Sequence, residues 1–276
     1  MKDWEKLKNK KRIVIKVGTS NLTYANGKVH FDRIEKLTRV ISDLQNSGKQ
    51  IILVSSGAIA VGCGKLHKMN KPKTLAEKQA LAAIGQAELM KIYQQFFSAY
   101  NQTVAQILLT KDVVTDPIKN KNARNTFNTL LKMNIIPIIN ENDTVATDEI
   151  EHLGYGDNDR LSADVAVLAQ AGLLIILSDI DGLFSSDPHI HKNAVRIPKV
   201  VTISKEIEKM ALGTKSAFAR GGMTTKIAAA KICSANGIDT VITNGKDLAN
   251  IYSITNGKES GTLFLGNKMA KKKQTH

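Results

Sequence analysis

The segment IVIKVGTSN, residues 13–21, carries more information about the fold than any other stretch of the chain. Its apolar part, 13–17, is typical of a strand buried inside a parallel sheet. Lys16 interrupts this part near its C-terminal end, and a turn of small residues follows from Gly18 to Ser20. Ligands of open α/β sheets bind beyond the carboxyl ends of the strands, and free N–H groups in such a turn suit a phosphate. The segment therefore predicts a phosphate site, and the alternative is a lysine that only extends its charge to solvent.

The composition disfavours several classes of protein. The chain has 276 residues, of which 42% are hydrophobic and 5% aromatic, so a β-sandwich or an aromatic platform for nucleic-acid bases is disfavoured. No apolar run is long enough for a membrane span, and the N-terminal residues do not form a signal peptide. The two cysteines, Cys63 and Cys233, lie far apart and fit a reduced protein. We therefore expect a cytoplasmic protein with a sizeable core.

The net charge of +14 is concentrated at the two ends of the chain. Residues 1–12 contain six basic and two acidic residues, and residues 267–276 contain four lysines and no acid, which leaves +6 on the rest. We predict that both ends are mobile tails. The moderately basic body suits an enzyme with anionic substrates, and a specific nucleic-acid-binding protein is the weaker alternative.

Strand and helix patterns alternate along the chain, which is typical of an α/β protein with a mainly parallel sheet and helices on both faces. A turn is predicted at Asn26-Gly27, and a short hairpin or loop at 144–152. No repeat or linker marks a boundary, so we expect one domain with a soft division near Ala171. The expected strands are 13–17, 50–54, 104–109, 135–139, 173–177 and 240–243, and the expected helices are 31–46, 75–100, 123–133, 161–171 and 223–235.

Five of these strands end in glycine or small polar residues. Because parallel strands have their carboxyl ends at one edge of the sheet, we expect these residues to form a single polar site. The five strand ends are Gly18-Thr19-Ser20, Ser56-Gly57-Ala58, Asn140 to Asp143, Ser178-Asp179 and Asn244-Gly245.

Two glycine turns begin helices and could hold an anion through backbone N–H groups. Gly57 and Gly62 have the spacing of a Walker A loop, but Cys63-Gly64 stand where Lys and Ser or Thr are required, so this segment is no P-loop. In the second turn, Gly221-Gly222-Met223-Thr224-Thr225-Lys226, a lysine lies near the helix N-terminus, where the helix dipole disfavours a cation. A bound phosphate would explain Lys226, and an exposed surface lysine is the alternative.

Aspartates near the same edge exceed what local structure requires. Asp157-Asn158-Asp159 precedes a helix, and one of the two aspartates would suffice as its N-cap. Three further aspartates follow strands, where they could meet a substrate, a nucleotide or a metal ion: Asp143, Asp179 and Asp181.

The histidines indicate no catalytic centre. His189 and His191 could bind a metal ion, but their position in a polar stretch favours coincidence. No Ser-His-acid order is evident, and Ser56 is interpreted as a binding residue rather than a nucleophile.

Several motifs resemble the glutamate 5-kinase family, a branch of the amino acid kinase superfamily. The resemblance covers residues 12–265, and TLAEKQALAAIGQ and NENDTVAT separate this family from acetylglutamate, aspartate, carbamate and uridylate kinases. The motifs are IVIKVGTSN (13–21), SSGAIAVG (55–62), TLAEKQALAAIGQAELM (74–90), PIINENDTVAT (137–147), GDNDRLSA (156–163) and GGMTTK (221–226).

The resemblance implies a three-layer αβα sandwich and an activity. MgATP would phosphorylate the side-chain carboxylate of L-glutamate to L-glutamyl 5-phosphate, the first step of proline biosynthesis. It also implies a homo-oligomer, a dimer or tetramer, with L-proline as a feedback inhibitor, and we expect the short form without the PUA domain that many members carry. The expected parts are a glutamate-binding part (about 1–171), an ATP-binding part (about 172–266) and a basic tail (267–276).

The implied chemistry needs no general base, because a carboxylate acceptor is already ionised at pH 7. It needs alignment and positive charge around the moving phosphoryl group. By resemblance, Lys16 stabilises the transferring phosphoryl group, Lys226 stabilises the phosphates of ATP, and Asp159 holds both ammonium groups in position.

The residues for the two substrates are implied by the same motifs. Asp143 suits the ammonium group of glutamate, and Ser56 and Asn158 suit its carboxylates. Arg220 departs from the family, which more often has Gly-Thr where Ala219-Arg220 stand, so its role stays open. The implied glutamate-binding residues are Ser56, Gly57, Asp143 and Asn158, and the implied ATP-binding residues are Lys16, Gly18, Ser178, Asp179, Arg220, Gly221, Gly222, Met223, Thr224, Thr225 and Lys226; no residue is assigned to a metal ion.

Two alternatives remain open. The first is another kinase of the superfamily, with acetylglutamate or aspartate as its acceptor. The second is a non-catalytic protein that binds nucleic acid through its basic ends.

Overall fold

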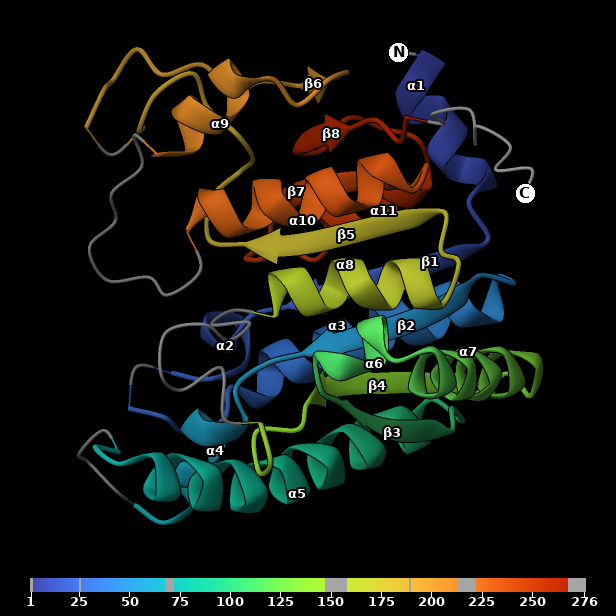
Figure 1. The fold of residues 1–276 in the computed structure, drawn as a ribbon, viewed down its shortest axis with the longest axis vertical. Helices are drawn as coiled ribbons and strands as arrows, with labels where there is room; N and C mark the ends of the chain where they lie inside the picture. The colour runs from blue at the N-terminus through green and yellow to red at the C-terminus, as the bar shows by residue number, and fades with distance from the viewer. Residues whose placement is uncertain are drawn as a thin grey trace.

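An eight-stranded sheet forms the middle layer of the computed structural model, which describes residues 2–24, 26–67, 72–146, 158–188, 190–212 and 222–267. The strand order is β3-β4-β2-β1-β5-β7-β8-β6, and the strands lie one above the other in that order in Figure 1. Neighbouring strands are parallel except for the antiparallel pair β7–β8. The strands are β1 (Arg12–Val17), β2 (Gln50–Ser55), β3 (Val104–Leu109), β4 (Ile136–Glu141), β5 (Leu173–Ser178), β6 (Lys199–Val200), β7 (Asp239–Asn244) and β8 (Thr262–Phe264).

Helices cover both faces of this sheet, so the expected αβα sandwich with a mainly parallel sheet is confirmed. Helices α7, α8 and α10 pack on one face, and α3, α5 and α11 pack on the other. The helices are α1 (Lys2–Glu5), the 3-10 helix η1 (Lys6–Asn9), α2 (Thr19–Leu22), α3 (Phe31–Asn46), α4 (Ala58–Lys65), α5 (Leu75–Ala99), α6 (Asp112–Thr115), α7 (Pro117–Lys132), α8 (Asp159–Leu168), α9 (Lys205–Leu212), α10 (Met223–Ala235) and α11 (Ala249–Thr255).

The central strand β1 divides its side chains between two hydrophobic cores. Ile13 and Ile15 belong to the core under α3 and α5, and Val14 belongs to the core under α8 and α10. Successive side chains of a strand point to opposite faces, so Lys16 projects to the same face as Val14. The position of a lysine beneath α8 and α10 is therefore fixed by the alternation of the strand.

The turn after β2 is held by close packing of the two helices that follow it. Gly57, the N-cap of α4, has a φ of 96°, a left-handed conformation that favours glycine. A Cβ atom on Gly85 of α5 would lie only 1.7 Å from the carbonyl oxygen of Ala58. Only glycine at position 85 lets α5 approach the start of α4 this closely, and this packing fixes the turn at Ser56 and Gly57.

Several expected elements have different bounds in the structure. The helix expected at 123–133 begins at Pro117, because Asp116 caps it by accepting from the N–H groups of Ile118 and Lys119. The helix expected at 161–171 runs from Asp159 to Leu168. The sequence patterns did not indicate α9, α11, β6 or β8, which are all eight residues long or shorter. Most of the hairpin or loop expected at 144–152 lies outside the described residues.

The N-terminal residues are not the mobile tail that the charge distribution suggested. Residues 2–9 form α1 and η1, and Trp4 and Leu7 are buried in the core under α3 and α5. Asp3 binds Lys199 at 3.0 Å. The two apolar residues are three apart and share one side of a helical turn, so burial of this side outweighs the surrounding charge. The second expected tail, from residue 268 onward, lies outside the described residues.

The described helices were also compared with the dimensions of a bilayer. Across the parts of the chain that the structure describes, none is both long and apolar enough to cross one.

Candidate active site

Lys16, Asp159 and Lys226 form a buried charge cluster at the carboxyl edge of the sheet. The Lys16 Nζ atom lies 2.9 Å from Asp159 Oδ1, and the Lys226 Nζ atom lies 3.1 Å from Asp159 Oδ2. The exposed fractions of the three residues are 1%, 0% and 6%. The structure thus brings the three predicted residues into direct contact, although they are far apart in the sequence.

Local structure explains why these side chains meet. Lys16 projects from β1 toward α8 and α10, as described above. Asp159 is the first residue of α8, and Lys226 lies in the first turn of α10. Both helices pack on the same face of the sheet, so their N-terminal ends place the carboxylate and the second ammonium group beside Lys16.

The electrostatic balance of this cluster favours ionised groups. Burial alone would raise the pKa of Asp159, but the attraction of Lys16 and Lys226 outweighs burial and lowers the pKa below its usual value. The Thr225 hydroxyl also donates to Asp159 Oδ2 at 2.8 Å. Two cations and one anion leave the three side chains with a net positive charge, which suits an anionic ligand.

The cluster also explains the unusual position of Lys226 near a helix N-terminus. The sequence suggested that a bound phosphate neutralises this lysine. In the structure, the carboxylate of Asp159 is in contact with it, and the alternative of an exposed surface lysine is wrong because Lys226 is buried.

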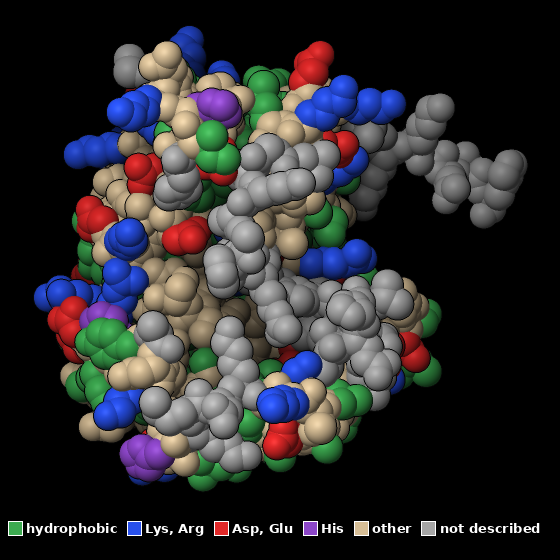
Figure 2. Space-filling view, turned by 90° about the vertical axis from the view of Figure 1, so that its left-hand side faces the viewer, with side chains coloured by type: hydrophobic (Ala, Val, Ile, Leu, Met, Phe, Trp, Pro, Cys, Tyr) green, Lys and Arg blue, Asp and Glu red, His purple; other side chains and the backbone are tan. Residues whose placement is uncertain are grey.

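The turns after β1 and β2 lie against each other beside this cluster. A Cβ atom on Gly18 would lie 3.6 Å from Lys16 Nζ, and one on Gly57 would lie 3.5 Å from the Thr19 side chain. The backbone of the first turn is therefore close to the Lys16 ammonium group, and the second turn packs against the first. Figure 2 faces this edge of the molecule, where the basic and acidic side chains of the described surface are interspersed rather than gathered into one basic patch.

An amide network connects β2, β4 and α5 on one side of the cluster. Asn158 Nδ2 donates to Asn140 Oδ1 and to the Ser55 carbonyl oxygen, each at 2.7 Å. Asn140 Nδ2 donates to Gln86 Oε1 at 2.9 Å. Both N–H groups of the Asn158 amide are therefore used within the protein. The expected contact of Asn158 with a substrate carboxylate stays a prediction.

Ser56 and Asp143 follow β2 and β4, two of the elements that this network connects. Ser56 Oγ is buried and has no hydrogen-bond partner within the described part of the chain. Asp143 lines a small cavity together with Ala58, Gln86 and Glu141. Burial raises the pKa of Asp143 to about 6, so this carboxyl group titrates close to neutral pH.

The predicted nucleotide residues lie on the other side of the cluster, around β5 and α10. Ser178 is buried and donates to Asp179 Oδ1 at 3.2 Å, whereas Asp179 is exposed. The side chain of Met223 is buried in the core, so only its backbone is available to a nucleotide. A Cβ atom on Gly222 would meet nothing within 4 Å, which leaves open space at the start of α10. Arg220, Gly221 and Asp157 are outside the described residues.

The described residues contain no group of three or more His, Cys, Asp or Glu that could hold a metal ion. His191 is described, whereas His189 is not.

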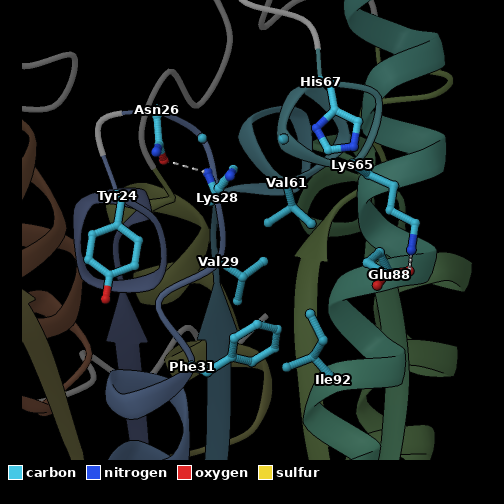
Figure 3. Close-up of a pocket in the computed structure, with 12 residues that line it drawn as sticks. Tyr24, Asn26, Lys28, Val29, Phe31, Val61, Lys65, His67, Glu88 and Ile92 are labelled. Carbon is cyan, nitrogen blue, oxygen red and sulfur yellow. Dashed lines mark hydrogen bonds and ion pairs between the residues drawn. The ribbon is translucent and has the colours of Figure 1, made fainter.

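A larger cavity lies away from the predicted residues. It has a volume of about 560 Å³ and is bounded by the segment from Tyr24 to Phe31, by α4 and by α5. Figure 3 shows the apolar side chains of Val29, Phe31 and Ile92 in its wall, and the ion pair Lys65–Glu88 at its side. None of the predicted binding residues lines this cavity.

Sequence reasoning missed two polar residues of the site. Gln86 lies in the middle of α5 and positions Asn140, and its place in the motif TLAEKQALAAIGQAELM was the available signal. Glu141 is buried between Asn140 and Asp143, and its only signal was its place in a run of four polar residues.

Comparisons with known proteins were made for the whole chain. The model of the amino acid kinase family matches residues 11–244. A glutamate 5-kinase of Clostridium perfringens is 52% identical over 95% of this chain and 98% of that protein. A glutamate 5-kinase of Listeria welshimeri is 53% identical over 96% of this chain and 97% of that protein.

Solved structures with the same fold include two UMP kinases. The enzyme from Bacillus anthracis has a TM-score of 0.62 at 15% sequence identity and covers 94% of this chain and 97% of its own. The enzyme from Ureaplasma parvum has a TM-score of 0.62 at 16% identity and covers 93% of this chain and 99% of its own. At this identity the likeness concerns the fold alone.

Proposed function

The chain belongs to the amino acid kinase family, and on that basis we propose that it transfers the γ-phosphoryl group of ATP to the side-chain carboxylate of L-glutamate. The product is L-glutamyl 5-phosphate, and the reaction is the first step of proline biosynthesis. The observation that carries this proposal is the buried cluster of Lys16, Asp159 and Lys226 at the carboxyl edge of the sheet. Glutamate as the acceptor is supported by the glutamate 5-kinases that are about half identical to the chain over nearly its whole length.

The strand order supports a division of the site between two substrates. Ser56 and Asp143 follow β2 and β4 on one side of β1, and Ser178 is the last residue of β5 on the other side. Lys16, on β1 itself, lies between the proposed glutamate and nucleotide positions. The parts 1–171 and 172–266 would therefore bind glutamate and ATP respectively, and the phosphoryl group would cross between them in front of Lys16.

The chemistry requires one bond to form and one to break at the γ-phosphorus. An ionised oxygen of the glutamate side chain attacks this phosphorus, the bond to the oxygen between the β- and γ-phosphates breaks, and its electron pair leaves with ADP. No general base is needed because the acceptor is already a carboxylate. Lys16 neutralises charge on the transferring phosphoryl group, and Lys226 neutralises charge on the phosphates of ATP. Asp159 contacts neither substrate and keeps both ammonium groups in place.

The acceptor side offers groups of the right chemistry for glutamate. The unpartnered Ser56 hydroxyl can donate to a carboxylate. Asp143, when ionised, can accept from the α-ammonium group. The carbonyl oxygen of Asn158 is a further acceptor, since both N–H groups of its amide are used by the protein.

Mg²⁺ would be carried mainly by the phosphates of ATP and by water. Protein sites for Mg²⁺ commonly supply one or two carboxylates and leave the remaining ligands to phosphates and water. The ion would neutralise phosphate charge. Positioning of the acceptor and of the two ammonium groups is left to the chain.

Three further parts of the proposal concern regulation, assembly and location. L-proline would compete with glutamate near Asp143, which competition kinetics would test. The chain would form a homo-oligomer, which sedimentation velocity would test. We place it in the cytoplasm, where both substrates are found, and fractionation of cells that express it would test this location.

The reaction is tested by glutamate-dependent release of ADP together with trapping of the acyl phosphate by hydroxylamine. L-glutamate should give the hydroxamate, whereas N-acetyl-L-glutamate, L-aspartate and UMP should give no product. Turnover of N-acetyl-L-glutamate without turnover of L-glutamate would overturn the proposal.

A matched pair of lysine variants on α10 tests the role of the cluster. Lys226→Met should lower kcat by roughly 100- to 1,000-fold, by analogy with the loss of one donor that stabilises transition-state charge. Lys231→Met removes an exposed lysine of the same helix that pairs with Glu208, and it should leave kcat unchanged. Equal kcat values for both variants would show that Lys226 takes no part in catalysis.

A further inference from the structure

We propose that Glu141 is a specificity-determining residue of the acceptor site and that its carboxylate binds the α-ammonium group of the amino acid substrate together with Asp143. This inference rests on the proposed function, because it concerns the acceptor of that reaction. Neither the sequence motifs nor the relatives assigned a role to Glu141.

The first observation is the burial of an acid without a partner. Glu141 is the last residue of β4 and is 4% exposed. Its Oε2 atom is fully buried and has no hydrogen-bond partner, and no ion pair of its carboxylate occurs among the described residues. The backbone N–H of Glu141 donates to Asn140 Oδ1 at 2.9 Å.

A buried carboxylate lowers the stability of the folded state unless a cation or a hydrogen-bond donor pairs with it. A buried carboxylate without a counter-charge carries a desolvation penalty of several kcal/mol. A folded protein retains that penalty when a ligand relieves it, and functional sites are where such groups are found. The missing partner of Glu141 must be a cation or a strong hydrogen-bond donor.

The second observation is the position of this carboxylate. Glu141 and Asp143 line the same small cavity, whose other walls include Ala58, Ala82 and Leu108. Gln86 also lines it, but its Oε1 atom already accepts from Asn140. Ala58 is the first residue of α4, directly after the proposed glutamate residues Ser56 and Gly57. The cavity that Glu141 lines therefore lies on the acceptor side and not on the nucleotide side.

The nature of the missing partner follows from the chemistry of the substrate. Glutamate carries two carboxylates and one ammonium group, and the carboxylates need donors such as Ser56 Oγ. The ammonium group has three N–H donors and a positive charge, so it can satisfy two carboxylates at once. An acetylated nitrogen has one N–H and no charge, and it would leave two acids uncompensated. The pair of acids would thus select a free amine through the cost of desolvation.

The test compares L-glutamate with glutarate, which lacks the ammonium group, in the wild-type chain and in Glu141→Gln. The variant should raise the KM for L-glutamate by about 10- to 100-fold, the usual loss for a hydrogen bond to a charged group. Its kcat and its KM for ATP should stay unchanged. The Ki of glutarate should stay equal or decrease, because glutarate has no ammonium group that could interact with the Glu141 carboxylate. Calorimetric titration of both ligands without ATP provides a second readout that does not depend on turnover.

Glu88→Gln is the matched control, because Glu88 lies on α5 in a partly exposed ion pair with Lys65. This variant should change the binding of neither L-glutamate nor glutarate. Glu141→Gln should fold at least as stably as the wild-type chain, since it removes an uncompensated charge. A lower midpoint of urea unfolding, or equal weakening of L-glutamate and glutarate, would show a structural role and overturn the inference. If the wild-type chain phosphorylates no glutamate, the proposed function fails; if it does and the glutamate-to-glutarate ratio is unchanged in Glu141→Gln, only this inference fails.

Discussion

Asp159 and Glu141 are buried carboxylates at the same edge of one sheet, but their surroundings are opposite. Asp159 lies between two ammonium groups and accepts from the Thr225 hydroxyl. Glu141 has no partner for its carboxylate in the part of the chain that the structure describes. The first acid is compensated by the protein before any substrate arrives, whereas the second is left for a ligand to compensate.

This contrast separates two ways in which a site uses buried charge. A charge that the protein itself pairs can hold catalytic cations in fixed positions, which lowers the reorganisation needed during the reaction. A charge that only a ligand pairs contributes to selectivity, because a ligand without the matching group leaves the penalty in place. The four predictions below test the two sides of this comparison.

The largest effect is expected for Asp159→Asn, which leaves two buried ammonium groups without their carboxylate. Loss of one member of a buried charge network costs about 3–5 kcal/mol of unfolding free energy. Urea unfolding followed by circular dichroism would measure this loss, and ATP should restore part of it because its phosphates supply negative charge.

Asp32→Asn is the control for that variant, because Asp32 forms an exposed ion pair with Lys36. Exposed pairs contribute about 0–1 kcal/mol, so its unfolding midpoint should hardly move. Equal losses for the two aspartates would show that the cluster is not a special feature of the fold.

The second effect concerns catalysis by the compensated cluster. Lys16→Met should lower kcat by roughly 100- to 1,000-fold, while the remaining pair of Asp159 and Lys226 keeps the protein folded. Single-turnover kinetics with saturating L-glutamate and ATP would measure the chemical step. Lys36→Met removes an exposed lysine and should leave this step unchanged; a defect confined to the KM for ATP would assign Lys16 to binding alone.

The third effect is a pH dependence of kcat/KM for L-glutamate, which concerns the acids that the substrate is proposed to pair. Burial raises the pKa of Asp143 to about 6, so this group loses its negative charge as the pH falls through 6. The ammonium group of glutamate then loses a partner, and kcat/KM for L-glutamate should fall by up to tenfold for each pH unit below about 6. Initial rates between pH 5 and pH 8 would measure the profile of the free enzyme.

Asp143→Asn sharpens that measurement, because an amide does not titrate in this range. Its kcat/KM should be low throughout and should lack the step near pH 6. The pKa of Asp159 is lowered by its two lysines, so Asp159 stays ionised and does not contribute. A step that persists in Asp143→Asn would have to come from another group.

The smallest effect is expected for Thr225→Val. The Thr225 hydroxyl has one proton, and it lies within hydrogen-bond distance of both Asp159 Oδ2 and the Gly222 carbonyl oxygen. Loss of a hydrogen bond to a charged group costs about 1.5 kcal/mol at the lower end, or roughly tenfold in kcat. Thr225→Ser keeps the hydroxyl and should retain the wild-type kcat, and a loss of equal size in Thr225→Ser would indicate packing rather than the hydrogen bond.

The expected elements that the structure contains are those with long apolar patterns. β1 and β5 are buried strands whose inner residues are apolar, apart from Lys16 in β1, and the apolar face of α3 has helical spacing. The short elements β6, β8 and α11 lacked such a pattern, because their burial depends on neighbours that are distant in the sequence. The N-terminal helices show the same limit, since the charges around Trp4 and Leu7 concealed a buried side.

The site shows where local reasoning stops. The parallel sheet made the meeting of strand ends predictable, and the helix dipole made Lys226 conspicuous. The use of the Asn158 amide was not predictable, because both of its N–H groups donate to residues of other strands. The same holds for Gln86, which reaches Asn140 from the middle of α5.

The sequence by itself determined the alternating α/β order, the parallel sheet and the place of Lys16 at the end of its central strand. These features follow from apolar periodicity and from the turn residues that border each element, and both are local properties. Only the tertiary structure decided that Asp159 lies between two lysines and that no described lysine or arginine pairs with Glu141. Whether a buried acid finds a counter-charge depends on distances of about 3 Å between helices and strands that are far apart along the chain, and local pattern carries no information about such distances.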